Sequence, residues 1–496
     1  MPQAVLRIDQ SDRPRQRFLG ARDSRLLIGG EWVPAAAGIT SETVDPTTEE
    51  VLARIAAADS EDVDRAVKAA RAAFESTAWS TMNPHDRTRL LLRVADAIEG
   101  NREEFAELEA LDIGAPYETG LNLAVEAANI FRYYAGWPTK ILGETYPSGP
   151  TEFRYTIREP IGVCGAIIPW NPTLLMSAWK LAPAMACGNT VILKPAEQAP
   201  LSVLRLGELL MDADLPPGVV NILTGTGESA GAAMVEHPGI DKIAFTGSTE
   251  VGKQILRESA GTLKRVTLEL GGKAPNIIFA DCEFDTAAIM ASVLVCTFTG
   301  QVCVSGSRVL VQDEIYDEFV ERLATEMAAY TIGDPFHPET RMGPLVSKEQ
   351  HERVNAYLEV GRREGADVRL GGYPIEGTGY FVSPTLFSDV TNSMRIASEE
   401  IFGPVASVIR FTDTEDAISK GNDTKYGLSA SVWTKDITKA HRVAREARAG
   451  TIYVNTWSAN DGVVPLGGYK QSGVGYEHGP RSVDSYTELK TVAIGQ

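Results

Sequence analysis

The chain has 496 residues, of which 44% are hydrophobic, so it can bury a large core and should divide into two or three domains. Its net charge of −19, without a long cluster of Lys or Arg, argues against nucleic acid and against an anionic membrane surface as partners, because both require a positive field. Its five cysteines are an odd number without a CxxC pair, which favours neither a disulfide framework nor a zinc site, and we expect no bound metal.

Residues 1–25 contain six arginines, but acidic residues and Pro14 interrupt them and no apolar segment follows. A transit peptide is therefore the less favoured interpretation, and we expect a frayed extension. No stretch approaches the roughly 20 apolar residues that a membrane helix needs. With cysteine usage that indicates a reducing compartment, these features predict a cytoplasmic protein.

The first elements expected along the chain are small. Residues 26–33 should form a hairpin around Gly29 and Gly30. An amphipathic helix should begin near Asp59 and Ser60, and a second should begin at Arg87. Both helices have one apolar face, so we expect them to serve packing.

From residue 161 to residue 270, apolar β segments alternate with helices. The strands expected are 163–168, 190–193, 219–223, 242–245 and 266–268, with helices over 174–186 and 201–211. This alternation predicts a parallel sheet covered on both faces, an organisation typical of dinucleotide-binding domains.

Two glycine loops in this region are candidates for holding a nucleotide. The usual G-x-G-x-x-G turn does not follow the first strand. Instead, residues 225–231 follow the third strand and residues 245–252 follow the fourth, where Ser248 can begin a helix whose backbone N–H groups bind phosphate. Each loop alone is a weak signal, but two loops at strand ends of one sheet favour nucleotide binding.

A second α/β region follows Gly272. We expect strands over 309–312, 428–433 and 451–454 and helices over 315–330, 348–363 and 438–447. The C-terminal residues 485–494 alternate between polar and apolar, so they should pair either with residues 153–157 or with another subunit. Because no flexible linker separates the regions, they should pack closely around a cleft.

Three residues are candidates for chemistry. Cys303 lies in a Gly- and Ser-rich turn, although a lone cysteine is more often an inert apolar residue. Glu269 ends an apolar strand directly before two glycines and is a candidate general base, with a structural ion pair as the alternative. Asn171 offers an uncharged donor for an oxyanion, with a simple turn before proline as the alternative.

The segment from Leu268 to Pro275, with Glu269, and the Gly300-Gln301 pair before Cys303 match the glutamate and cysteine signatures of the aldehyde dehydrogenase superfamily. The chain resembles this family over nearly its whole length. The resemblance implies an α/β fold with a parallel-sheet NAD-binding domain (1–137 and 160–271), an α/β catalytic domain (272–470) and a small β oligomerisation arm (138–159 and 480–496). A homodimer or homotetramer is the expected assembly.

The resemblance also implies a reaction, the NAD-dependent oxidation of a small aldehyde to its carboxylic acid. Cys303 would form a thiohemiacetal and then a thioester, Asn171 would hold the oxyanion and Glu269 would activate water. Lys194 and Glu197 would bind the adenosine ribose. The other residues expected to bind the cofactor are Ile168, Pro169, Trp170, Gly227, Gly231, Phe245, Thr246, Gly247, Ser248, Val251, Leu270, Gly271, Glu400 and Phe402. NAD is expected in preference to NADP, because Glu197 leaves no place for a 2′-phosphate.

Two other functions compete with this one. A thiol hydrolase would need an imidazole beside the cysteine, but the six histidines lie mostly in contexts typical of surface turns or helix faces. A non-enzymatic structural or binding descendant would have no need for Asn171, Glu269 and Cys303 together.

The cavity mouth should be less aromatic than is usual in the family, because Pro172 and Leu466 stand where aromatic residues are common. The other residues expected near the mouth are Thr297, Trp457, Asn460 and Asp461, and Met176 and Trp179 either line it or are core residues of their helix. This composition favours aliphatic over aryl aldehydes.

Overall fold

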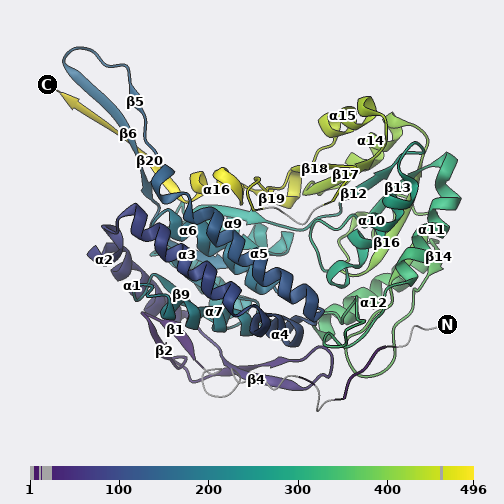
Figure 1. The fold of residues 1–496 in the computed structure, drawn as a ribbon, viewed down its shortest axis with the longest axis horizontal. Helices are drawn as coiled ribbons and strands as arrows, with labels where there is room; N and C mark the ends of the chain where they lie inside the picture. Colours follow the sequence, from purple (N-terminus) through teal and green to yellow (C-terminus); the bar gives the residue numbers. More distant parts are fainter. Residues whose placement is uncertain (1–4, 10–12, 14–24, 458–461, 496) are drawn as a thin grey trace.

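The molecule consists of two α/β lobes and a β arm that projects from one of them (Figure 1). The computed structural model describes residues 5–9, 13, 25–457 and 462–495. In Figure 1, the purple and blue elements make up most of the first lobe, green and yellow-green elements make up the second, and the yellow C-terminal elements β19, α16 and β20 return to the first lobe and the arm. The C-terminus lies at the tip of the arm.

The first lobe contains an eight-stranded sheet in the order β19-β11-β10-β7-β8-β9-β1-β2. The strands are Leu26–Ile28 (β1), Glu31–Val33 (β2), Val163–Ile167 (β7), Thr190–Lys194 (β8), Val220–Ile222 (β9), Lys242–Thr246 (β10), Arg265–Glu269 (β11) and Gly473–Val474 (β19). The five central strands are parallel, which confirms the prediction from their apolar composition. The hairpin β1–β2 and strand β19 add antiparallel edges.

Helices cover both faces of this sheet because successive strand residues point to opposite sides. In β8, Val191 and Leu193 pack into one core, whereas Ile192 packs into the other. The first core includes residues of α3 (Pro84–Gly100), α4 (Arg102–Ile113), α5 (Tyr117–Ala135), α6 (Thr173–Ala186) and α7 (Leu201–Asp212). The second includes residues of α1 (Ser60–Glu75), α8 (Ala232–Glu236) and α9 (Thr249–Ser259). We call these faces the α5–α6 side and the α8–α9 side.

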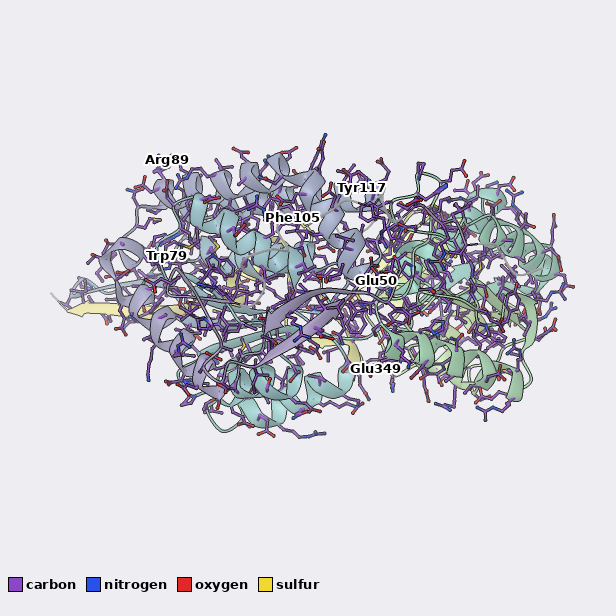
Figure 2. The ribbon with its side chains drawn as sticks, turned by 90° about the horizontal axis from the view of Figure 1, so that it is seen from below. Glu50, Trp79, Arg89, Phe105, Tyr117 and Glu349 are labelled. Carbon is purple, nitrogen blue, oxygen red and sulfur yellow. The ribbon has the colours of Figure 1, made fainter. Side chains whose placement is uncertain are left out.

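The second lobe contains a seven-stranded sheet in the order β14-β15-β16-β13-β12-β17-β18, parallel except for β14. Its strands are Pro275–Ile278 (β12), Arg308–Gln312 (β13), Asp367–Leu370 (β14), Thr385–Ser388 (β15), Val405–Phe411 (β16), Ser429–Trp433 (β17) and Thr451–Val454 (β18). Its helices are Phe284–Cys296 (α10), Tyr316–Ala328 (α11), Lys348–Arg363 (α12), Arg395–Ser398 (α13), Thr414–Asn422 (α14) and Ile437–Glu446 (α15). Figure 2 shows the two lobes side by side, with Tyr117 and Glu349 near the boundary between them.

The arm is a three-stranded antiparallel sheet of β5 (Thr145–Tyr146), β6 (Glu152–Pro160) and β20 (Thr487–Gly495). Strand β20 pairs with β6 along its whole length, so the C-terminal segment finds its partner within the same chain. Between the arm and the first sheet lies the short helix α16 (Gly479–Ser485). Phe153 and Ile494 lie opposite each other in this pairing and are 43% and 46% exposed, so the arm presents apolar side chains to its surroundings.

The N-terminal residues that the structure describes are not frayed, contrary to expectation. Arg7 donates hydrogen bonds to the carbonyl oxygens of Thr47 and Thr378. Arg13 is buried and its guanidinium lies 2.8 Å from the Asp45 carboxylate. Asp45 and Thr47 follow β3 (Thr40–Val44), which forms a hairpin with β4 (Val51–Ala56). The basic residues of this segment thus have defined partners that composition alone does not reveal.

Helix α3, which corresponds to the second helix predicted from the sequence, begins at Pro84, three residues before the predicted start at Arg87. The Asn83 side chain accepts a hydrogen bond from the His85 N–H and caps the helix, and proline at the first position is compatible with a helix start.

Within the described residues, no helix is both long and apolar enough to cross a membrane.

Candidate active site

A cavity of about 660 Å³ lies where the carboxyl ends of β7, β8, β10 and β11 meet the second lobe. The carboxyl edge of a parallel sheet is the usual place for a ligand in an α/β fold. Every residue that the sequence analysis assigned to catalysis or to cofactor binding lines this cavity. Residues far apart in the chain therefore meet at one site.

The turn that carries Cys303 is held in an unusual backbone conformation. After α10, Phe298 and Thr299 have φ angles of 51° and 56°, a region that β-branched and bulky residues rarely adopt. The Thr299 hydroxyl donates to the Gly343 carbonyl at 2.9 Å, and Gly300 packs so closely on Gly403 that a Cβ there would lie 2.2 Å from its backbone. The second lobe thus fixes the path of the chain into Cys303.

Two glycines bring the strand end of Glu269 against this turn. A Cβ at Gly272 would lie 2.2 Å from the carbonyl oxygen of Cys303, and a Cβ at Gly271 would lie 2.3 Å from the Glu400 carboxylate. The Gly272 N–H donates to that carboxylate at 2.9 Å. Only glycine permits so close an approach, which explains the Gly-Gly pair after Glu269.

The Cys303 thiol is half-buried and lines the cavity, whereas the other four cysteines are buried. Burial raises the pKa of the Cys303 thiol to about 12, and the nearby carboxylates of Glu400 and Glu269 contribute in the same direction. The resting thiol is therefore protonated at neutral pH. Its use as a nucleophile requires a base or a nearby positive charge.

Glu269 is a buried carboxyl that faces the cavity. Neither of its oxygens accepts a hydrogen bond from a described residue. Burial raises its pKa well above the ordinary value, and the charge of Glu477 adds to this effect while Lys180 opposes it. Lys180 is itself buried, pairs with Glu477 and donates to the Thr246 hydroxyl at 2.7 Å. Glu269 is thus a weak acid with free lone pairs, as a general base requires.

Asn171 follows β7 and precedes α6. Its side-chain nitrogen donates one hydrogen bond to the carbonyl oxygen of Gln301, at 2.6 Å. An amide nitrogen carries two hydrogens, so this bond fixes the side chain and leaves a second donor on a group that lines the cavity with Cys303.

The strand ends offer features that fit a dinucleotide. Ser248 caps the N-terminus of α9, so the first backbone N–H groups of that helix lie beside the cavity, where they favour phosphate. At the end of β8, the Lys194 ammonium lies 3.7 Å from the Glu197 carboxylate, and Glu197 is partly exposed. Phe402 meets Trp170 edge to face at 5.8 Å. The residues at these strand ends therefore fit the NAD that the sequence predicts.

Sequence reasoning missed one wall of the cavity. Helix α5 contributes residues at helical spacing, and α12 contributes part of the boundary with the second lobe. The residues are Thr119, Asn122, Leu123 and Glu126 from α5, and Glu349, Gln350 and Arg353 from α12. The only signal for the α5 wall in the sequence is the set of polar side chains on one stripe of an otherwise apolar helix.

The expectation that Leu466 lies at the cavity mouth is wrong, because Leu466 is buried in the core and is absent from the lining. The lining does include Met176, Trp179, Thr297 and Trp457, and Phe298 adds an aromatic ring that was not expected there. The preference for aliphatic over aryl aldehydes stays a prediction. Asn460 and Asp461 lie outside the described residues.

His478 is not at a surface turn but is 1% exposed. Its ring lies edge-on to Trp179 with centroids 4.0 Å apart, and burial lowers its pKa to about 3. No histidine lines the cavity among the described residues, and within the same residues no cluster of His, Cys, Asp and Glu could hold a metal ion.

Residues 32–492 match the model of the aldehyde dehydrogenase family. The chain belongs to this family. It is 48% identical over 475 residues to aldehyde dehydrogenase 1A1 of Gallus gallus, which covers 95% of this chain and 93% of that protein. It is also 48% identical over 474 residues to the putative aldehyde dehydrogenase DhaS of Bacillus subtilis (strain 168), with 95% of each chain covered. The NAD+ complex of an aldehyde dehydrogenase from Bacillus cereus superposes with a TM-score of 0.95 at 48% identity, over 96% of this chain and 97% of that one.

Proposed function

We propose that this protein oxidises an aldehyde to the carboxylic acid with NAD as the oxidant. The observation that carries the proposal is the meeting of Cys303, Glu269 and Asn171 in one cavity that also reaches the strand ends and the α9 N-terminus. A thiol hydrolase is disfavoured because no histidine among the described residues lines the cavity. A purely structural role is disfavoured because it needs neither a half-buried thiol nor a buried carboxyl without a hydrogen-bond donor.

The reaction follows from the chemistry of the three side chains. The Cys303 sulfur attacks the aldehyde carbon, and its proton leaves to a base, giving a thiohemiacetal. The free N–H of Asn171 donates to the carbonyl oxygen as it becomes an oxyanion. Bound NAD would supply the hydride acceptor that oxidation of this adduct to a thioester requires. Glu269 then removes a proton from water, which attacks the thioester and releases the acid and the thiol.

Residues at the strand ends would hold NAD. The support comes from the phosphate-binding geometry of the α9 N-terminus, from the acidic Glu197 after β8, and from the NAD+ complex of the Bacillus cereus relative. Glu400 and Phe402, on the boundary with the second lobe, would contact the nicotinamide end. Because Gly272 holds one Glu400 oxygen, the other oxygen remains for the ribose.

The function is tested by mixing the purified protein with NAD and a set of simple aldehydes and recording NADH absorbance. Growth of absorbance that depends on both reagents is expected. Absence of NADH, together with hydrolysis of thioester or amide substrates in a separate assay, would instead favour the hydrolase.

Glu197 should select NAD over NADP. A carboxylate that accepts both ribose hydroxyls repels a 2′-phosphate, so we expect kcat/KM for NAD to exceed that for NADP by about tenfold or more. Glu197→Gln should narrow this ratio, because Lys194 remains nearby to attract a phosphate. A wild type that favours NADP, or a ratio that the substitution leaves unchanged, would remove Glu197 from the ribose site.

The arm should join subunits. We propose that residues 138–159 and 480–496 form this arm, that 1–137 with 160–271 bind NAD, and that 272–470 supply Cys303. The exposed pair Phe153 and Ile494 is apolar surface of the kind found at subunit interfaces. We therefore expect a homodimer or homotetramer.

Replacing both Phe153 and Ile494 by Asp should lower the mass measured by light scattering to that of a smaller species. Ile437→Asp is the matched control, because Ile437 is 66% exposed on α15 in the second lobe. An unchanged mass in the arm variant, or an equal loss in the control, would contradict the assignment of this face.

A further inference from the structure

The α5–α6 side of the cavity carries a carboxylate without a partner. Glu126 lies on α5 and lines the cavity, together with Thr119, Asn122 and Leu123 on the same stripe of the helix. No described basic side chain forms an ion pair with Glu126. The Glu126 side chain is exposed at the mouth of the cavity, so a ligand can reach it from solvent. The partial loss of solvent there raises its pKa, and no cation opposes that effect.

The other charged groups around the cavity differ from Glu126. Glu197 lies 3.7 Å from Lys194, and Glu400 accepts a hydrogen bond from Gly272. Among the described residues, the basic side chains of the lining are Lys194 and Arg353, and both are engaged, since Lys194 pairs with Glu197 and Arg353 donates to the Glu400 carbonyl at 2.7 Å. Glu236, Glu258 and Glu349 line the cavity from α8, α9 and α12, away from the α5–α6 side.

Aromatic rings accompany Glu126 on its side of the sheet. Trp179 belongs to the core of α5 and α6, and Phe298, Trp457 and Cys303 pack against that same core. All four line the cavity. Indole rings attract ammonium and guanidinium groups through their electron-rich faces, and a nearby carboxylate strengthens that attraction. A cavity lined by this carboxylate and these indole rings disfavours an anion and gains little from a hydrocarbon.

The net charge of the whole chain also favours a cationic substrate. A net charge of −19 raises the local concentration of cations and lowers that of anions near the protein. The region that holds the thiol and the region that holds Glu126 therefore suit an aldehyde with a positive charge at its far end.

We propose that the preferred substrate is an aldehyde whose remote end carries a quaternary ammonium or another cationic group, bound by Glu126 and the Trp179 and Trp457 rings. This proposal rests on the proposed function and specifies the substrate class of the same cavity. Glu126 acts on specificity, and the chemistry remains with Cys303, Glu269 and Asn171.

The test compares three aldehydes of matched shape in wild type and Glu126→Gln. The first is trimethylammonio-butanal, whose quaternary nitrogen cannot cyclise onto the aldehyde. The second is its uncharged isostere, in which carbon replaces nitrogen, and the third carries a carboxylate at the same end. Glu118→Gln is the matched control, since Glu118 is exposed on the same helix but outside the cavity lining.

We expect wild-type kcat/KM for the cationic aldehyde to exceed that for the isostere by about tenfold, and Glu126→Gln to remove most of this difference. For the isostere, kcat/KM should change by no more than about twofold in either variant. For the carboxylate substrate, kcat/KM should rise only in Glu126→Gln. High salt should reduce the wild-type preference, because part of it is electrostatic. Equal kcat/KM for the charged and uncharged aldehydes, or a ratio that Glu126→Gln leaves intact, would overturn the proposal.

Binding separates this proposal from the proposed function. The amide corresponding to the cationic aldehyde cannot be oxidised, and calorimetry reports its affinity without turnover. If the amide binds more weakly to Glu126→Gln than to wild type and to Glu118→Gln, the cationic site is supported, whether or not any aldehyde gives NADH. Failure of every aldehyde to give NADH would contradict only the dehydrogenase activity. Oxidation of the isostere together with equal amide affinity in both proteins would contradict only the cationic site.

Discussion

Replacing Cys303 by alanine is expected to lower the rate of NADH formation by about three orders of magnitude or more, because oxidation requires the covalent adduct first. The substitution removes a half-buried side chain and leaves the strand ends untouched, so NAD binding should persist. The measurement is steady-state NADH formation together with NAD titration by protein fluorescence. Activity within about tenfold of wild type would reject Cys303 as the nucleophile.

Cys296→Ala is the matched control for this experiment. Cys296 is fully buried at the end of α10, in a core of the second lobe that does not include the cavity. Its replacement by a smaller side chain should reduce stability modestly and leave kcat/KM close to the wild-type value. A loss as large as that of Cys303→Ala would indicate that the fold around the turn is disturbed in both variants.

Replacing Glu269 by glutamine is expected to allow one rapid round of NADH release per active site and then nearly stop turnover. The thioester can still form, but the water that should hydrolyse it has lost its base. Rapid mixing with NAD and aldehyde measures the burst amplitude and the later rate separately. If the burst disappears with the steady state, Glu269 also deprotonates Cys303, whose own pKa of about 12 makes such help necessary.

The pH dependence of turnover and of stability tests the role of Glu269 a second time. The raised pKa of Glu269 means that the carboxyl becomes a base only as pH rises through that value, so wild-type deacylation should increase with pH on this limb. A buried carboxyl with a raised pKa also destabilises the fold once it ionises. The stability that the neutral form contributes is present below the unfolded pKa and is lost as pH rises through the folded pKa. Glu269→Gln should therefore resist alkaline unfolding better than wild type.

The sequence predicted the parts of the site that depend on local pattern. Apolar segments of the right length predicted the parallel strands, and the Gly-Gly pair placed Glu269 at a strand end. Those features are encoded within a few neighbouring residues, so they can be read without knowing the fold. The glycine loops were located for the same reason, because the helix cap at Ser248 is a local signal.

The parts that the sequence did not predict depend on contacts between distant segments. Glu126 faces the cavity only because α5 packs on α6, and nothing in the sequence of α5 specifies that contact. His478 is buried because Trp179, from an earlier helix, covers its ring. From its basic sequence context, Arg13 is expected to be a solvent-exposed charge. Its ion pair with Asp45 forms only because the β3–β4 hairpin lies beside the N-terminal segment. Tertiary packing decides each of these cases.

The close contacts of Gly271 and Gly272 with Glu400 and Cys303 have a consequence for how this enzyme can diversify. A side chain at Gly272 would push the Cys303 main chain away, and a side chain at Gly271 would displace the Glu400 carboxylate, so both positions require glycine. On the α5–α6 side, in contrast, Asn122 and Glu126 on α5 and Trp457 after β18 reach the cavity through their side chains. Variation there, in nature or in a mutant library, can exchange one aldehyde for another while the catalytic machinery stays intact. Libraries that seek new substrates should therefore sample Asn122, Glu126 and Trp457 and keep the glycine pair constant.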